Sequence, residues 1–311
     1  MTGLREEQDR MATNGYRLYL SDGSRWWITG DAFNARWIDK LAAIMGLEES
    51  ASNGSPKLVF CKKGHLNGVV YGGTDSLPSK SRSSENGNGW YFYDHDTLRV
   101  WYHNEIPDVI CEMNNSEGYE IEIINMWNSL QPIYQQSICR GGLSLHAGLA
   151  ELDGRGYLLV GSSDKGKSTC CRRLPDYWKP LCDDEALVVL DEYKKYRAHP
   201  FPSWSDHLWD RSKKTWDVQS SVALHGVFLL EQSEIDEVVP VGEGQASVHI
   251  SESAMQICQK FWRTLDGKGQ RQFRTALFNN ACQMAKQIPA YRLRVSLHGR
   301  FWEKMEQVIG K

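Results

Sequence analysis

A glycine-rich segment in the middle of the chain has the residue types and spacing of a phosphate-binding loop. Residues 157–174 read YLLVGSSDKGKSTCCRRL, an apolar run followed by G-x-x-x-x-G-K-[ST] and a helix start. Glycines let successive backbone N–H groups turn towards phosphate oxygens, and the helix start adds positive potential. In this pattern the lysine reaches the outer phosphates and the Ser hydroxyl can bind Mg²⁺. The candidate nucleotide-binding residues are Gly161, Ser162, Ser163, Asp164, Lys165, Gly166, Lys167, Ser168 and Thr169.

A pair of carboxylates follows this loop. Together with Glu185, they stand directly before the apolar run 186–190, ALVVL: the pair is Asp183 and Asp184. The interval between Lys167 and Asp183 has room for one short helix and a return strand. We therefore expect both acids at a sheet edge, where Mg²⁺ or a substrate hydroxyl can meet them. Taken alone, the pair is also typical of a solvated turn, and it is the neighbouring loop that favours the first interpretation.

Residues 145–190 resemble the catalytic core of the HPr kinase/phosphorylase family. The shared features are a strand that contains a His, a strand leading into a Ser-containing phosphate loop, one helix and an Asp-Asp pair. In detail, GKSTCCRRLP, LCDDEALVV and HPFPSWSD (199–206) look most like the SynChlorMet cassette protein ScmC, a branch found beside radical-SAM peptide-modifying genes. A looser resemblance covers most of 131–311.

The resemblance implies a role for five residues. Lys167 and Ser168 match the family's phosphate-loop lysine and Mg²⁺-binding serine. Asp183 matches the general base on the acceptor hydroxyl, Asp184 matches its metal-binding neighbour, and His146 matches an active-site histidine. Without the resemblance, His146 is more typical of a histidine in a core or a strand.

The sequence also departs from the family pattern. Asp164 stands where the family usually has Gly, and it brings a negative charge to the phosphates. Pro175 is expected to end the helix after the loop early. No segment matches the part that supports phosphorolysis in bifunctional members, so we do not expect phosphorylase activity.

Other elements of the second half follow from local patterns. Strands are expected over 223–231 and 291–297, and a closing helix over 300–309. The Pro- and Trp-rich segment 199–210 predicts a rigid loop. Four cationic residues fall in an expected loop and helix, where one of them could reach the nucleotide or the phosphorylated acceptor, or all could lie on a solvated face: Arg263, Lys268, Arg271 and Arg274.

The first half reads as a strand-rich module. Two short strands are expected within 16–29 around the turn Ser21–Ser24, followed by a helix capped by Asp31 that ends at Gly46. Further strand-like runs lie at 57–61, 68–71, 90–93, 98–102 and 119–124, with a Ser/Asn/Gly-rich surface loop at 76–89. A boundary in the helical segment 126–139 divides the chain into residues 1–130 and 131–311.

Composition describes an ordinary globular chain. Apolar residues make up 41%, and 36 Lys and Arg against 39 Asp and Glu give a net charge of −3. Because no global basic field is available to hold a polyanion, nucleic acid is not the expected ligand. No apolar stretch is long enough to span a bilayer, and the charged start of the chain is unlike a signal peptide, so we expect a cytoplasmic protein that does not bind membranes. The fold class is α+β or α/β: the strand-rich module followed by an HPr-kinase-like phosphate-loop domain with a mixed sheet and flanking helices.

Cysteine and tryptophan usage adds two interpretations. The eight cysteines form no CxxC pair and no disulfide framework, so structural zinc is disfavoured, and Cys170 and Cys171 are expected to pack the helix rather than to act in redox control. The 12 tryptophans are expected to be core anchors, with a peptide-binding surface as the alternative. Segments 25–29 and 90–93 would receive an extended peptide if they lay at a sheet edge.

Taken together, the sequence predicts an ATP- and Mg²⁺-dependent kinase that acts on a Ser or Thr hydroxyl of a peptide or small protein. Its expected partners are that acceptor and other peptide-modifying enzymes, with a homo-oligomer left open. A nucleotide-binding accessory protein without phosphoryl transfer remains an alternative, as does a kinase of a small molecule such as free serine. Residues 1–130 would either select the acceptor or only complete the fold.

Overall fold

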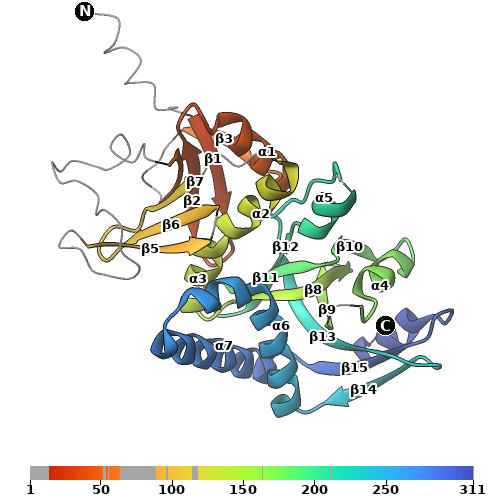
Figure 1. Cartoon of the computed structure of the whole chain (residues 1–311). Helices are drawn as coiled ribbons and strands as arrows, with labels where there is room; N and C mark the ends of the chain where they lie inside the picture. The colour runs from red at the N-terminus through yellow and green to blue at the C-terminus, as the bar shows by residue number, and fades with distance from the viewer. Residues whose placement is uncertain are drawn as a thin grey trace, which may run out of the picture. The chain divides into compact units, whose positions relative to one another are not determined.

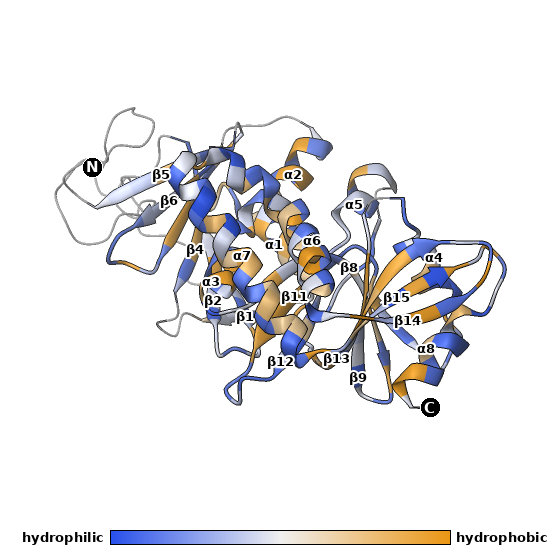
Figure 2. Cartoon of the chain, turned by 90° about the horizontal axis from the view of Figure 1, so that it is seen from below, coloured by the Kyte–Doolittle hydropathy of each residue, from blue (hydrophilic) through white to orange (hydrophobic). Residues whose placement is uncertain are grey.

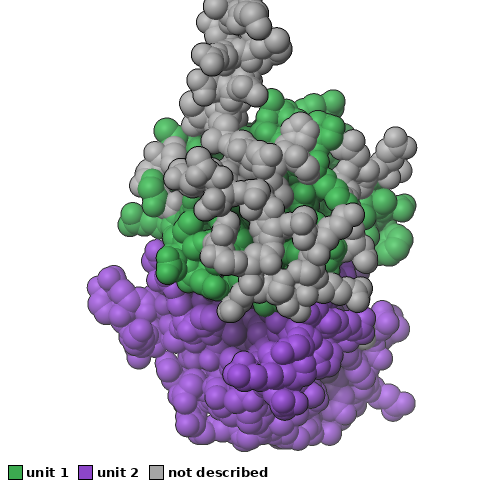
Figure 3. Space-filling model, turned by 60° about the vertical axis from the view of Figure 1, so that its left-hand side comes forward, with its two compact units in different colours: residues 1–20, 24–132, 204–215 green, residues 21–23, 133–203, 216–311 purple. Residues whose placement is uncertain are grey.

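A computed structural model describes residues 14–51, 54, 56–63, 89–95, 97–113, 118–162, 164–210 and 212–310. The chain forms two compact units (Figure 3). Unit 1 comprises Met1–Leu20, Ser24–Pro132 and Trp204–Thr215, and unit 2 comprises Ser21–Gly23, Ile133–Ser203 and Trp216–Lys311. Each unit includes a short segment from the part of the chain that mainly forms the other unit. The division into domains 1–130 and 131–311 therefore stays a prediction.

The described strands of unit 1 form one mixed sheet in the order β3-β1-β2-β4-β7-β6-β5 (Figure 1). The pairs β2–β4 and β4–β7 are parallel, and the others are antiparallel. The strands are β1 Asn14–Tyr19, β2 Arg25–Gly30, β3 Glu48–Ala51, β4 Lys57–Lys62, β5 Trp90–His95, β6 Leu98–His103 and β7 Val109–Met113. The hairpin and the strands expected at 57–61, 90–93 and 98–102 are confirmed, whereas 68–71 and nearly all of 76–89 lie outside the described residues.

Helix α1, Ala35–Met45, ends at Gly46 as expected, but Asp31 does not cap it. The N-cap residue is Asn34. One carboxylate oxygen of Asp31 accepts from the backbone N–H of Asn34 at 3.0 Å, and the other accepts from the backbone N–H of Lys62 at 3.0 Å. Asp31 therefore ties the turn before the helix to β4, a use of its carboxylate that depends on a strand distant in sequence.

The strand predicted over 119–124 is wrong, because this segment opens helix α2, Tyr119–Ser129. The alternation YEIEI suggested a strand, yet Glu120 and Glu122 lie in the first helical turn, where acidic side chains favour a helix start. A second helix, α3 Gln131–Cys139, follows directly. The helical segment expected over 126–139 is thus two helices that meet at Leu130.

Most of the tryptophans are core anchors. Seven are at most 8% exposed: Trp26, Trp27, Trp90, Trp101, Trp178, Trp204 and Trp216. Trp209 is the contrary case, 77% exposed. The suggestion that segment 25–29 offers a sheet edge is wrong, because β2 pairs with β1 on one side and β4 on the other. Strand β5, which includes 90–93, pairs with β6 alone among the strands that the structure describes.

The described strands of unit 2 form a second mixed sheet. Its strands are β8 Leu143–Leu152, β9 Arg155–Val160, β10 Lys179–Cys182, β11 Glu185–Leu190, β12 Tyr196–Phe201, β13 Val222–Gln232, β14 Glu237–Val241 and β15 Ala290–Val295. The order is β10-β8-β11-β12-β13-β15-β14, and β9 pairs with both β8 and β13. Strand pairing therefore forms a closed ring that runs from β8 through β11, β12, β13 and β9 back to β8. Strands β9, β13 and β15 are parallel, so their carboxyl ends meet at one edge.

Four helices accompany this sheet: α4 Lys167–Arg173, α6 Glu243–Thr264, α7 Gly267–Gln287 and α8 Phe301–Ile309. Helix α6 packs on α7 and on β8, and α8 lies on β14 and β15. Figure 2 shows hydrophobic stretches along the strands and both kinds of residue along the helices. The expected strands at 223–231 and 291–297 and the closing helix are confirmed within one or two residues. Among the described residues, no helix has the length and apolar character needed to cross a membrane.

The segment 199–210 is not a loop, as the sequence suggested. Its first residues end β12, and Trp204–Asp210 form helix α5. Pro200 is opposite Ala186 of β11, whereas the pairing of β12 with β13 covers only Arg197 and Ala198, so on the β13 side no ladder bond needs a donor at residue 200. His199 is fully buried between the carbonyl of Val218, 2.9 Å from Nδ1, and the N–H of Ser21, 3.1 Å from Nε2.

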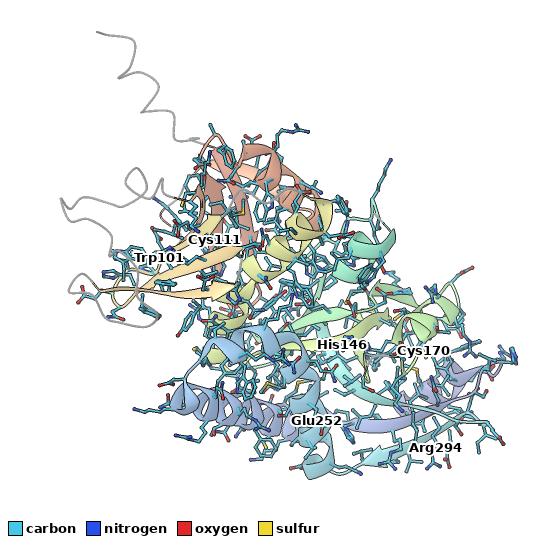
Figure 4. The ribbon with its side chains drawn as sticks, viewed as in Figure 1. Trp101, Cys111, His146, Cys170, Glu252 and Arg294 are labelled. Carbon is cyan, nitrogen blue, oxygen red and sulfur yellow. The ribbon has the colours of Figure 1, made fainter. Side chains whose placement is uncertain are left out.

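Cys170 and Cys171 of α4 belong to an apolar cluster with residues of β8, β9 and α8 (Figure 4 labels Cys170). Burial raises the pKa of Cys170 to about 11, so its thiol stays protonated. Gly148 of β8 makes this packing possible, because a Cβ there would come within 2.8 Å of the Cys171 sulfur. The interpretation of both cysteines as packing residues is confirmed. Helix α4 ends at Arg173, two residues before Pro175, as expected.

Candidate functional site

Strand register brings three separate segments to one edge of the second sheet. Ala147 of β8 is opposite Val160 of β9, so His146 lies beside the start of the phosphate loop that follows β9. Glu185, the first residue of β11, is opposite His146. The turn that precedes β11 therefore lies at the same edge and carries Asp183 and Asp184. This edge includes the carboxyl ends of β9 and β13, where open sheets commonly hold ligands.

The phosphate loop is closed over its own lysine. The Lys167 ammonium donates to the carbonyl oxygens of Gly161 at 2.9 Å and Ser162 at 3.2 Å, and the side chain is only 6% exposed. The backbone N–H of Lys165 donates to Ser162 O at 3.3 Å. The loop carbonyls thus hold the Lys167 ammonium at the start of α4.

Two loop residues have left-handed backbone conformations. Gly166 has φ 94°, and a Cβ built there would meet nothing within 4 Å, so the space beside the helix start is open. Asp164 has φ 65°, a conformation that Gly adopts freely and that Asp tolerates better than most residues. The side-chain amide of Gln232, at the end of β13, donates to the Asp164 carbonyl at 2.8 Å. This geometry explains why Gly suits position 164 and how Asp can occupy it.

The three consecutive acids have different surroundings. Asp183 Oδ1 accepts the hydroxyl of Ser203 at 2.5 Å, and Asp184 Oδ1 is 2.9 Å from Nε2 of His146. Glu185 is 1% exposed and accepts from the Ser144 hydroxyl at 3.2 Å. Asp183 and Asp184 are partly exposed, so they are open to a ligand, whereas Glu185 is a buried residue of the sheet.

His146, which is labelled in Figure 4, has a partner at each ring nitrogen. Its Nε2 contacts Asp184, and its Nδ1 is hydrogen-bonded to the side-chain oxygen of Gln256 on α6. Its backbone carbonyl accepts from the Ser253 hydroxyl at 3.1 Å, also on α6. Helix α6, which the sequence patterns did not indicate, therefore fixes both the main chain and the ring of His146.

The electrostatics of the edge centre on Lys167. Burial lowers the pKa of Lys167, and the negative charges of Asp184, Asp164 and Asp183 partly offset this effect. Because the Lys167 ammonium interacts with all three carboxylates, it lies close to both the acidic turn and the loop. The structure thus brings together Lys167, Asp183, Asp184 and His146, which the sequence placed in three different segments.

The residues present fit a bound Mg²⁺–phosphate group. The Ser168 hydroxyl at the start of α4 makes no hydrogen bond to any residue that the structure describes, and the partly exposed Asp184 carboxylate is 2.9 Å from His146. No group of three His, Cys, Asp or Glu side chains in the described ranges converges on a metal centre. Thr169 is exposed on α4, and Ser163 lies outside the described residues.

A cavity of about 490 Å³ adjoins the loop and adds residues that the sequence analysis missed. Its lining comprises Val160, Gly161, Ser162, Lys165, Leu229, Leu230, Glu231, His249, Glu252, Ser253, Gln256 and Arg292. The arginine at this cavity is Arg292 of β15, and none of the four cationic residues considered between 263 and 274 lines it. The sequence carried no signal for Gln256 or Arg292, because each reaches the cavity only through tertiary packing.

Residues 109–310 match the protein family described as SynChlorMet cassette protein ScmC. The chain belongs to the ScmC family. The match starts at β7 and continues through the loop, the acidic turn and α6, so the whole candidate site of this ScmC protein lies within it. No curated protein matches the sequence.

Proposed function

We propose that this ScmC protein is an ATP- and Mg²⁺-dependent kinase, related to HPr kinases, that phosphorylates a Ser or Thr hydroxyl of a peptide or small protein. One observation carries the proposal: the lysine of a phosphate-loop sequence shares one sheet edge with two partly exposed carboxylates and a histidine. A nucleotide-binding loop alone needs neither the acidic pair nor the histidine. Phosphoryl transfer to a hydroxyl needs a cation at the phosphates and a group that accepts the hydroxyl proton.

Each of these residues has a task that its surroundings support. Lys167 binds the outer phosphates, exchanging its bonds to two loop carbonyls for charge-assisted bonds to phosphate oxygens. Asp183 accepts the proton of the acceptor hydroxyl, whose oxygen forms the new bond to phosphorus as the bond to the ADP oxygen breaks. The Ser203 hydroxyl on Asp183 Oδ1 supports this role, because it demonstrates that the carboxylate can accept from a serine.

Asp184 and Ser168 are the residues proposed to hold Mg²⁺, which when bound neutralises charge on the transferring phosphoryl group. His146 keeps the Asp184 carboxylate oriented through its Nε2, and Gln256 keeps the ring of His146 in place. His146 is therefore a positioning residue in this proposal rather than a group that contacts the acceptor.

A second candidate function is a nucleotide-binding accessory protein of a peptide-modification complex, without phosphoryl transfer. Asp164 favours this alternative. Its carboxylate acts on Lys167 and would also repel nucleotide phosphates. Other peptide-modifying enzymes are the partners that we propose in either case, because the family is named for a cassette.

Incubation of the full-length protein with γ-labelled ATP and Mg²⁺ separates these functions. The acceptors to compare are serine- and threonine-containing peptides, free serine and water. The proposal expects label on peptides that depends on Mg²⁺ and is lost in Asp183→Asn. Label on free serine would indicate a small-molecule kinase. Nucleotide-dependent thermal stabilisation without label on any acceptor or release of phosphate would support the accessory protein and overturn the kinase.

A further inference from the structure

A second cavity of about 640 Å³ lies between α6 and α7, next to the one at the phosphate loop. Helix α6 supplies Met255 and Gln259 to its wall, and α7 supplies Arg274 and Phe278. We call it the α6–α7 groove. Phe278 is 44% exposed, so part of its aromatic ring is available to a ligand in the groove.

The α6–α7 groove shares a wall with the candidate site. Glu252 and Gln256 line both cavities, and Gln256 is also the residue that is hydrogen-bonded to His146 (Figure 4 labels His146 and Glu252). A molecule that reaches from the groove past Gln256 therefore arrives at the loop and the acidic turn. The two cavities offer separate places for two substrates that meet at one point.

The charged side chains of the two cavities differ in whether they have a partner of opposite charge. At the loop side, Arg292 is 3.6 Å from Glu231, and His249 is 3.4 Å from Glu252. In the α6–α7 groove, Arg274 makes no ion pair with any residue that the structure describes. The groove thus contains Arg274, which has no ion-pair partner among the described residues, the carboxylate of Glu252, which is 3.4 Å from His249, and the apolar surfaces of Met255 and Phe278. A guanidinium prefers a planar carboxylate, and the apolar surfaces prefer an aliphatic or aromatic side chain.

We propose that the α6–α7 groove binds a segment of the acceptor peptide, with an Asp or Glu of that segment on Arg274 and an apolar side chain against Met255 and Phe278. This inference rests on the proposed function only in calling the bound peptide an acceptor. Binding of a peptide with an acidic and an apolar side chain in the groove does not depend on phosphoryl transfer. Selection of the acceptor is then a property of unit 2, within the part of the chain that matches the ScmC family.

The test uses an array of immobilised short peptides with a central serine and varied flanking residues, probed with labelled full-length protein in the presence of Mg²⁺ and a non-hydrolysable ATP analogue. Binding is measured without transfer. The variants are Arg274→Glu, Phe278→Asp and the milder Phe278→Ser. The matched control is Arg271→Glu, because Arg271 is an exposed α7 arginine that lines neither cavity. Nucleotide-dependent thermal stabilisation reports that each variant is folded.

The wild-type protein is expected to retain peptides that combine an acidic with an apolar residue. In Arg274→Glu, retention of these peptides should fall at least tenfold, and peptides that contain Lys or Arg should be retained instead. Both Phe278 variants should weaken retention of all peptides. Arg271→Glu should resemble the wild type. An unchanged pattern in Arg274→Glu and Phe278→Ser would overturn the groove, as would absence of retention by the wild type. If the array behaves as expected but γ-labelled ATP gives no phosphopeptide, the kinase proposal fails and the groove stands.

Discussion

Charged side chains lie at different places in the two sheets. In unit 1, Glu112 sits inside strand β7 and is 5% exposed, and its carboxylate accepts from the Trp101 indole at 3.1 Å and from Arg99 at 3.3 Å (Figure 4 labels Trp101). Those partners come from β6, the neighbouring strand. In unit 2, Asp183 and Asp184 lie between the end of β10 and the start of β11 and are partly exposed, and Lys167 is at the buried start of α4.

This difference teaches where to look for chemistry in the fold. A charge in the middle of a strand is surrounded by its own sheet, so its neighbours must satisfy it permanently. A charge just beyond a strand end has protein on one side only, and its remaining hydrogen-bonding capacity is left for a substrate. Arg99 and Glu112 therefore contribute to stability, whereas the residues at the edge of the second sheet are those to which the proposed function assigns binding and catalysis.

The largest expected effect is on transfer in Asp183→Asn. The amide oxygen can still accept the Ser203 hydroxyl, so the fold and Mg-ATP binding should persist, while loss of the proton acceptor should lower turnover about 10²- to 10⁴-fold. Turnover with γ-labelled ATP measures this. The companion variant Asp184→Asn should mainly raise the Mg²⁺ concentration needed. Near wild-type turnover in Asp183→Asn would remove the general-base assignment.

His199 sharpens the comparison, because it is a histidine inside a strand rather than at a strand end. Burial lowers its pKa from 6.5 to about 4. The unfolded chain therefore binds the proton more tightly, and stability that is fully present above pH 6.5 is lost as the pH falls towards 4. The loss is up to about 3 kcal/mol from this residue. Denaturant melts of His199→Gln should show a flatter profile between pH 6.5 and 4.

The exposed His225 provides the control for this experiment, since His225→Gln should leave the pH profile unchanged. A wild-type stability that does not fall between pH 6.5 and 4 would contradict the assignment of His199 as a neutral, buried residue.

Lys167→Ala should weaken nucleotide binding about 10- to 100-fold, because a charge-assisted bond to phosphate contributes about 1.5 to 3 kcal/mol. Mg-ATP-dependent thermal stabilisation measures the loss, and the apo protein should remain folded. Lys304→Ala, an exposed lysine of α8, is the matched control. Undiminished nucleotide affinity would remove the foundation of the proposed function.

Glu112→Ala tests the other side of the comparison. Without its carboxylate, Arg99 and the Trp101 indole lose a shared acceptor, and we expect a loss of about 2 kcal/mol in the free energy of unfolding. Chemical denaturation measures it. Nucleotide affinity of the folded protein should not change. A stable Glu112→Ala variant with impaired nucleotide binding would show that the division between the two sheets is wrong.

The smallest expected effect is that of Asp164→Gly, which should tighten nucleotide binding about two- to fivefold by removing one negative charge near Lys167. Stability should change little, since Gly relieves the left-handed conformation but gives the unfolded chain more freedom. Asp164→Asn separates the two causes, because Asn removes the charge and still tolerates φ 65°. If Asp164→Gly tightens nucleotide binding and Asp164→Asn does not, the effect is due to the backbone conformation rather than to the charge.

Local patterns were enough for the phosphate loop and the elements around it. The strand before residue 161, the helix from Lys167 to Arg173, its end before Pro175 and the strand after Asp184 all depend on neighbours in sequence, namely glycine conformations, a helix start and an apolar run. The same is true of the first hairpin and of the closing helix. For these segments, short-range preferences and tertiary packing favour the same structure.

Tertiary structure decided the features whose partners are distant along the chain. The alternation at 119–124 suggested a strand, yet the segment folds as α2. Asp31 bonds to a strand thirty residues on, and β2 lies inside its sheet, because strand order is not encoded in a single strand's pattern. At the site, Gln256 reaches His146 and Ser203 reaches Asp183 only after α6 and β12 have packed. Sequence alone could name the groups to which we assign chemistry, but the groups that hold them in position share no local pattern with them, and only the folded chain brings them together.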